Sequence, residues 1–204
     1  MKRIRKLLGM AVAFAFALAI LPATALAVDE YDLHVNGEQF TSEKLVIDCG
    51  EGTATYDPAT QNLTLNNATI TKATMSGGIY SMLSNDLTIT LQGNNQITLE
   101  NNLGAIIKSN LKIEGPGTLT INVTGDTQDG ITCQWGSVDI MNATLVINAS
   151  GGIGISAYGT VRLDNVNLTD NGLYAGIDAL NLIIANGSDV KLSAKQDYCN
   201  AAYI

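Results

Sequence analysis

Short runs of alternating hydrophobic and polar residues recur along this chain at nearly constant intervals. Each run has the form apolar–x–apolar–x and ends in Asn or Gly, and the ends of successive runs are 21 to 27 residues apart. Alternation with a period of two is typical of β-strands that bury one face, and a unit repeated at this length is typical of a solenoid. The six runs are residues 63–67, 89–93, 111–115, 138–142, 161–165 and 182–186.

Two further apolar pieces complete most of the repeats. Strands of this kind bury their apolar faces only by stacking on the next repeat, and crossovers between parallel strands are almost always right-handed. The pattern therefore predicts an all-β fold, a right-handed parallel β-helix of about six coils. The second pieces begin with Ile70, Ile97, Leu119, Leu145, Leu168 and Val190, and the third with Gly78, Gly104, Gly130, Gly152 and Gly176.

Alignment of the six runs predicts which side chains face the interior and which residues form the turns. Twelve aligned positions contain only Leu, Ile or Val. The turn residues are all Asn or Gly, which tolerate a left-handed backbone, and stacked Asn side chains are expected to hydrogen-bond along the axis. The two inward ladders are Leu63, Ile89, Leu111, Val138, Val161, Leu182 and Leu65, Leu91, Ile113, Ile140, Leu163, Ile184; the turn residues are Asn67, Gly93, Gly115, Asn142, Asn165 and Asn186.

The segment before the repeats has a different pattern. It contains an Asn36-Gly37 hairpin signal and a turn at residues 57–60, so residues 28–60 are expected to form a β-hairpin cap that protects the open edge of the β-helix. Residues 61–204 are expected to form the β-helix, with a C-terminus that is uncapped or truncated, because residues 197–204 resemble the beginning of another coil. The alternative fold, a β-sandwich of hairpins, predicts two-residue Asn-Gly hairpins between strands and no common register across the repeats, whereas the Asn36-Gly37 hairpin lies outside the repeats.

Residues 1–27 have the pattern of a secretory signal peptide. Four basic residues precede an apolar stretch at residues 7–21, and Ala25-Leu26-Ala27 supplies small residues for cleavage. The protein is therefore expected to be secreted or extracellular, with a possible association with the cell envelope. No second long apolar segment follows, so the mature chain is not expected in the membrane.

The charge of the remaining chain restricts its partners. Residues 28–204 hold all 19 acidic residues but 7 of the 11 Lys and Arg, which gives a formal charge of −12. Nucleic acid is not an expected partner, because phosphate binding needs clustered Lys and Arg. Neutral glycans and calcium are compatible with this charge.

The three cysteines, Cys49, Cys133 and Cys199, match no metal-binding spacing. With coils about 4.8 Å apart, Cys49 and Cys199 are separated by roughly 25–30 Å, well beyond the reach of a disulfide. No intramolecular disulfide is expected, and Cys133 is predicted to be a buried apolar residue.

Several segments resemble those of a known group of proteins. Residues 31–37, 54–60, 63–70 and 115–121 resemble adhesin-like exported proteins of Gram-positive bacteria that are often called carbohydrate-binding-domain-containing. The resemblance implies a pectate-lyase-like right-handed β-helix, glycan binding at the cell surface and, in some members, bound calcium. This chain departs from the group in its corners, of which only residues 125–130 are rich in acid.

A row of charged residues is a first candidate site. Lys112, Asp139 and Arg162 are predicted at the same outward position of three successive coils, where neighbouring side chains interact. A polysaccharide lyase would use Arg162 or Lys112 as the base and Asp139 or Asp164 to hold calcium, and a glycoside hydrolase would use Asp139 and Asp164 as its carboxylate pair. The simpler interpretation is a solvated, charge-paired face.

An aromatic pair is a second candidate site. Trp135 and Tyr158 precede aligned Gly residues on neighbouring coils, and Lys108 comes before them in the same ladder. Two adjacent exposed rings offer a surface on which a sugar ring packs, whereas two buried rings only stack on each other. Exposure of Trp135 decides between these interpretations.

Residues 125–130 are a third candidate. Asp126 and Asp129 supply two carboxylates near backbone carbonyls, which are ligands that calcium prefers, although a plain acidic loop has the same sequence. Calcium is the one cofactor that the sequence suggests.

The favoured function is a secreted or cell-surface module that binds polysaccharide, such as a cell-surface glycan, without catalysis. The alternatives are a polysaccharide lyase or glycoside hydrolase, an inactive relative of one, or a structural spacer. The oligomeric state is left open.

Overall fold

The computed structural model describes residues 28–195 and 202–203, and all regular secondary structure in this range is β-strand. Twenty-two strands form three sheets, named A, B and C, of eight, eight and six strands. None of the described residues forms a helix long and apolar enough to cross a membrane. The predicted signal peptide lies outside the described residues.

From β5 onward the strands of each sheet follow one another in chain order, because every coil contributes one strand to each sheet. Sheet A contains, from one edge to the other, β2 (Glu38–Thr41), β1 (Glu30–Val35), β7 (Gly77–Ser81), β10 (Leu103–Ile107), β13 (Ile131–Cys133), β16 (Ile153–Ala157), β19 (Ala175–Asp178) and β22 (Ala202–Tyr203). Sheet B contains β3 (Val46–Cys49), β4 (Gly52–Asp57), β5 (Asn62–Asn66), β8 (Leu87–Gln92), β11 (Leu111–Glu114), β14 (Val138–Met141), β17 (Thr160–Asp164) and β20 (Asn181–Ala185). Sheet C contains β6 (Thr69–Ile70), β9 (Asn94–Glu100), β12 (Thr118–Thr124), β15 (Thr144–Ala149), β18 (Asn167–Gly172) and β21 (Asp189–Ala194).

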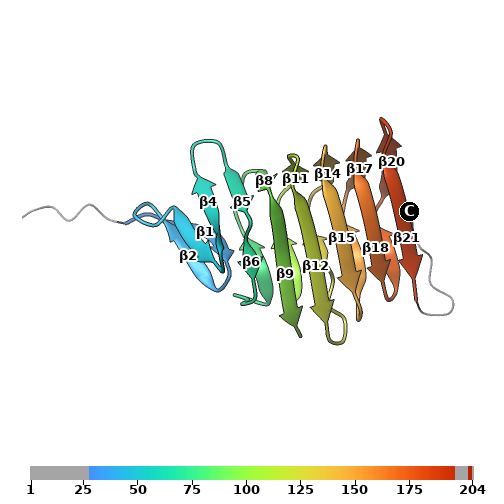
Figure 1. Ribbon diagram of the computed structural model, residues 1–204, viewed down its shortest axis with the longest axis horizontal. Helices are drawn as coiled ribbons and strands as arrows, with labels where there is room; N and C mark the ends of the chain where they lie inside the picture. Colours follow the sequence, from blue (N-terminus) through green and yellow to red (C-terminus); the bar gives the residue numbers. More distant parts are fainter. Residues whose placement is uncertain (1–27, 196–201, 204) are drawn as a thin grey trace, which may run out of the picture.

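The chain runs through sheets B, C and A in turn and then begins the next coil. The strands from β5 onward pair in parallel with the matching strands of the neighbouring coils. Six such coils stack along the long axis of the molecule, as the colours of Figure 1 show. The prediction of an all-β parallel β-helix of about six coils is confirmed.

Antiparallel strands cover the first coil. Strand β1 pairs antiparallel with β2 and with β7, and β4 pairs antiparallel with β3 and with β5. The predicted hairpin is present, with Asn36 (φ 52°) and Gly37 (φ 84°) as its two turn residues. The first parallel strand begins at Asn62, close to the boundary expected at residue 60.

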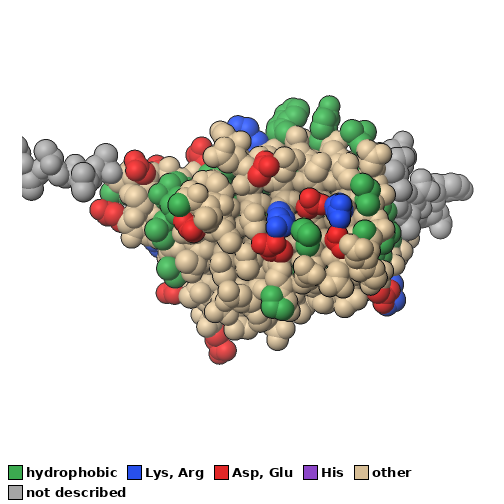
Figure 2. All heavy atoms as spheres, turned by 90° about the horizontal axis from the view of Figure 1, so that it is seen from above, with side chains coloured by type: hydrophobic (Ala, Val, Ile, Leu, Met, Phe, Trp, Pro, Cys, Tyr) green, Lys and Arg blue, Asp and Glu red, His purple; other side chains and the backbone are tan. Residues whose placement is uncertain are grey.

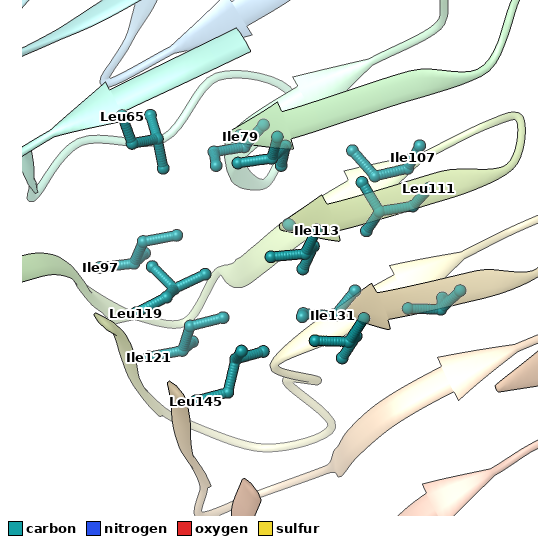
Figure 3. Close-up of a cluster of buried hydrophobic side chains, with 14 of the residues drawn as sticks. Leu65, Ile79, Ile97, Ile107, Leu111, Ile113, Leu119, Ile121, Ile131 and Leu145 are labelled. Carbon is teal, nitrogen blue, oxygen red and sulfur yellow. The ribbon is translucent and has the colours of Figure 1, made fainter. Parts of the chain in front are cut away.

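The interior is filled by aliphatic side chains from all three sheets, which point toward one another in stacked layers (Figure 3). Of the twelve predicted inward residues, ten are buried, from Leu63 to Leu163. The two exceptions are in β20: Leu182 is only half-buried, and Ile184 is 51% exposed. This part of the prediction is wrong because no described sheet B strand follows β20 to cover its residues.

In sheet B the predicted register is wrong by two residues at one place. Ile89 pairs with Ile113 rather than with Leu111, and Leu111 pairs with Leu87. A shift of two residues keeps every side chain on its own face of the sheet, which is why the predicted residues are still buried. The glycine ladder has a similar error, because Gly154 rather than Gly152 aligns with Gly130.

All six predicted turn residues have a left-handed backbone, with φ between 46° for Asn186 and 112° for Gly115. The amide Nδ2 of Asn165 donates to Oδ1 of Asn142 on the preceding coil at 2.8 Å. The expected hydrogen bonding between stacked Asn side chains is therefore confirmed at this turn.

Two of the cysteines, Cys49 and Cys133, are buried free thiols, so Cys133 is the apolar core residue that the sequence predicted. Burial raises the pKa of the Cys49 thiol to about 11. Cys199 lies outside the described residues. Ala202–Tyr203 pair with β19 and complete the sixth coil, where the sequence indicated the beginning of a further one.

Candidate functional site

The predicted charge row lies on the outer face of sheet B. Lys112 pairs with Asp139 across β11 and β14, and Asp139 pairs with Arg162 across β14 and β17. Figure 2 looks onto this face and shows basic and acidic side chains gathered in its middle. The sequence alignment therefore placed these three residues correctly at one register.

The ion pairs on this face run mainly along single strands. Lys112 Nζ lies 2.6 Å from Glu114 Oε2, and Arg162 Nη2 lies 2.5 Å from Asp164 Oδ2. Residues two apart on a strand share one face of the sheet, so each cation has a carboxylate partner on its own strand. Between coils, Arg162 Nε is 3.9 Å from Asp139 Oδ1.

These contacts fix the charge state of the row. Hydrogen bonds from Arg162 and from Asn186 lower the pKa of Asp164 below its usual value. The hydrogen bond to Asp164 raises the pKa of the Arg162 guanidinium. Both groups therefore stay charged at neutral pH.

A groove of about 420 Å³ lies on the same face, across strands β8, β11 and β14. Asp86 and Asn110 line it where β8 and β11 begin, and Lys112 and Asp139 line it further along the strands. Asn110 holds this end of the groove together: its Nδ2 donates to Asp86 Oδ1 at 3.0 Å, and its Oδ1 accepts from the amide of Ser137 at 2.8 Å.

Trp135 and Tyr158 stand at the edge of this face, in the connections that lead from sheet A into sheet B. They are 70% and 66% exposed, their ring centroids are 6.1 Å apart, and the ring planes are inclined by 50°. Leu180, which is also exposed, follows on the next coil, where its amide donates to the carbonyl of Gly159. Figure 2 shows hydrophobic side chains projecting along this edge, and we call Trp135, Tyr158 and Leu180 the aromatic edge.

The glycine after Trp135 allows the turn that carries the ring to pack closely on the preceding coil. A methyl group on Gly136 would come within 2.6 Å of the amide nitrogen of Asn110, so this turn packs closely on the preceding coil and leaves no room for a side chain. The exposed Trp135 belongs to this tight turn and comes two residues before Ser137, which lines the groove. Lys108, the third predicted ligand-binding residue, is exposed in the corresponding connection of the preceding coil.

The predicted calcium ligands do not share a common arrangement. Asp126 is exposed, whereas Asp129 accepts hydrogen bonds from the Ile153 amide at 2.8 Å and the Thr132 hydroxyl at 3.1 Å. Burial raises the pKa of Asp129 despite these donors. Within the described residues, no group of three or more His, Cys, Asp or Glu side chains is close enough to hold a metal ion. Calcium binding at Asp126 and Asp129 stays a prediction.

The sequence-based predictions did not include one buried acidic residue, Asp170. Asp170 is fully buried in sheet C, where Ile147 and Leu192 occupy the same register on the neighbouring coils. Neither of its carboxylate oxygens has a hydrogen-bond partner among the described residues. The break in an otherwise apolar ladder is a signal that the alignment of sheet C strands contains.

Comparison with known proteins found no matching family model, no similar curated protein and no similar solved structure. The structure therefore establishes the β-helix fold, and the resemblance to carbohydrate-binding exported proteins stays a sequence-based expectation.

Proposed function

We propose that this protein binds polysaccharide without catalysis, through the groove of sheet B and the aromatic edge beside it. The observation that carries the proposal is the pair of exposed rings, Trp135 and Tyr158, on neighbouring coils next to a polar groove. As the sequence suggests a signal peptide, we place this activity outside the cell, as in an adhesin-like surface protein.

Physical chemistry favours a sugar ligand for this arrangement. Aromatic side chains left in water forgo a large burial gain, so two of them on one edge indicate a surface that is covered when a ligand binds. The apolar faces of sugar rings pack on such side chains while their hydroxyls hydrogen-bond to polar groups. The groove supplies these groups, and its volume is within the range of ligand-binding sites.

The charge row supports binding more than catalysis. Lys112 and Arg162, the proposed lyase bases, are each engaged with a carboxylate, and a base needs a free lone pair near neutral pH. Asp164 has a lowered pKa, whereas the general acid of a glycoside hydrolase needs a raised one. A structural spacer, the third alternative, has no use for exposed rings beside a groove.

The experiment uses intrinsic fluorescence, because Trp135 is the only tryptophan in the chain. Purified protein is titrated with a panel of oligosaccharides, with and without a chelator. Binding is measured by calorimetry for every variant, and also by fluorescence for the variants that keep Trp135. Trp135→Ala and Tyr158→Ala are expected to weaken binding by about two- to tenfold, the range that one aromatic contact contributes. Tyr174→Ala is the matched control, since Tyr174 is an exposed aromatic residue outside the aromatic edge.

Two results would contradict the proposal. If a glycan binds equally well to wild type and to both edge variants, the aromatic edge is not the site. If incubation with a polysaccharide releases new reducing ends or unsaturated products, the protein is an enzyme.

A further inference from the structure

The charged side chains around the groove differ in how closely they are paired with an opposite charge of the protein. Lys112 and Arg162 form close ion pairs with Glu114 and Asp164, so their charges are already compensated along their own strands. An anionic ligand that approached these cations would have to displace a carboxylate that the protein holds in place. The face therefore offers little attraction to a polyanion.

Two carboxylates of the groove, those of Asp86 and Asp139, retain free hydrogen-bond acceptor positions. Asp139 is 3.9 Å from Arg162 Nε, beyond hydrogen-bond distance, and its side chain is 51% exposed. Asp86 accepts a hydrogen bond from the neutral amide of Asn110 and is otherwise exposed. A carboxylate has about four acceptor positions, so both groups retain oxygen lone pairs that face the groove.

These two carboxylates lie two coils apart, on β14 and immediately before β8, with the groove between them. Two coil spacings correspond to about 9.6 Å along the axis, and Trp135 comes two residues before Ser137, which lines the groove. A chain ligand that packs on Trp135 would thus place its polar substituents between Asp86 and Asp139. The whole chain adds a long-range negative potential, because residues 28–204 carry a formal charge of −12.

We infer that the groove is selective for polysaccharides with free amino groups, such as polymers of glucosamine, over neutral chains and still more over polyuronates. The inference rests on the proposed function and adds the chemical class of its ligand. A protonated amine meets Asp86 and Asp139, while the apolar face of the same sugar packs on Trp135. A uronate places a carboxylate against these two and is repelled, which makes the selectivity a matter of unfavourable as well as favourable charge contacts.

The test compares three oligosaccharides of equal length at slightly acidic pH and low ionic strength. They are an oligoglucosamine, the same oligomer after N-acetylation, and an oligogalacturonate measured with and without calcium. The oligoglucosamine is expected to bind between about two- and twentyfold more tightly than its acetylated form, the range that two exposed charge pairs supply. Added salt is expected to remove this difference by screening.

The variant that isolates the two carboxylates is Asp86→Asn combined with Asp139→Asn. It is expected to abolish the preference for the free amine, which is measured as the ratio of the affinities of this variant for the two oligomers. Glu100→Gln combined with Glu43→Gln, which removes two charges from exposed positions outside the groove, is the matched control and keeps the preference. Thermal unfolding of each variant verifies that the fold is intact.

The outcomes separate this inference from the proposed function. Equal, Trp135-dependent binding of the amino and acetylated oligomers overturns the selectivity but keeps glycan binding. Tighter binding of the oligogalacturonate, with or without calcium, also overturns it. Failure of every oligosaccharide to bind overturns the proposed function and the inference together.

Discussion

The carboxyl group of Asp170 lies against Gly154 in the interior of the β-helix. A methyl group on Gly154 would come within 1.6 Å of Asp170 Oδ1, so only glycine leaves room for this side chain. The same packing recurs on the two preceding coils, where Ile147 lies against Gly130 and Ile121 against Gly104. Asp170 therefore occupies a position that the repeat shapes for isoleucine.

The first prediction is that Asp170→Ile stabilises the protein. The substitution replaces an unpartnered, buried carboxyl by the residue that the repeat accommodates, and removes the cost of burying a polar group. The free energy of unfolding at neutral pH is expected to rise by about 3 kcal/mol, measured by chemical denaturation. Asp126→Ile, an exposed acidic position, is the control and should change stability little. A loss of stability in Asp170→Ile would show that the carboxyl has a favourable role in the core.

The second prediction concerns pH. Burial raises the pKa of Asp170 to about 8, above its unfolded value near 3.9, so the native state holds a proton that the unfolded state releases. Its contribution to stability is complete below about pH 4 and is lost as the pH rises toward 8, at about 1.4 kcal/mol per pH unit. Denaturation of wild type and Asp170→Asn between about pH 5 and 8 measures this slope as the difference between the two. Parallel pH profiles would mean that Asp170 is ionised in the native protein.

Sequence alone predicted the coils because strand alternation and the Asn or Gly turns repeat in every copy. The sequence aligned Leu111 with Ile89 instead of Leu87, an error of two residues. A two-residue shift keeps the same side chains facing inward, so the periodicity of the sequence does not distinguish the two registers. That error does not account for Asp170, because the sequence aligns Leu145, Leu168 and Val190 in the observed register and so places Asp170 in line with Ile147 and Leu192. The carboxyl was therefore predictable as a polar break in an apolar ladder, but spacing alone does not show that it is buried without a partner.

For the site, the alignment placed Lys112, Asp139 and Arg162 in one row but not their partners. The short contacts are with Glu114 and Asp164 on the same strands, and which side-chain rotamers meet is set by local packing rather than by spacing. Exposure of Trp135 was equally undecided in the sequence, because a stacked, buried pair and a projecting pair have the same spacing.

The third prediction tests the turn ladder at Asn165. This residue has a φ of 55°, and its side-chain Nδ2 donates a hydrogen bond to Asn142 Oδ1. Asn165→Gly keeps the left-handed backbone and loses the hydrogen bond, which is expected to cost about 1 kcal/mol. Asn165→Ala loses both and is expected to cost about 1–2 kcal/mol more. Urea denaturation of the two variants separates the contributions, and equal losses would mean that the backbone conformation carries no cost here.

The last prediction compares two residues of one inward ladder. Leu163 in β17 is fully buried, whereas its partner Ile184 in β20 is 51% exposed. Leu163→Ala leaves a cavity between coils on both sides and is expected to cost about 2–5 kcal/mol. Ile184→Ala removes a side chain that is already half in water and is expected to cost less than about 1 kcal/mol. Equilibrium unfolding of both variants gives the ratio directly. A large loss for Ile184→Ala would indicate that the inward face of β20 is covered in solution.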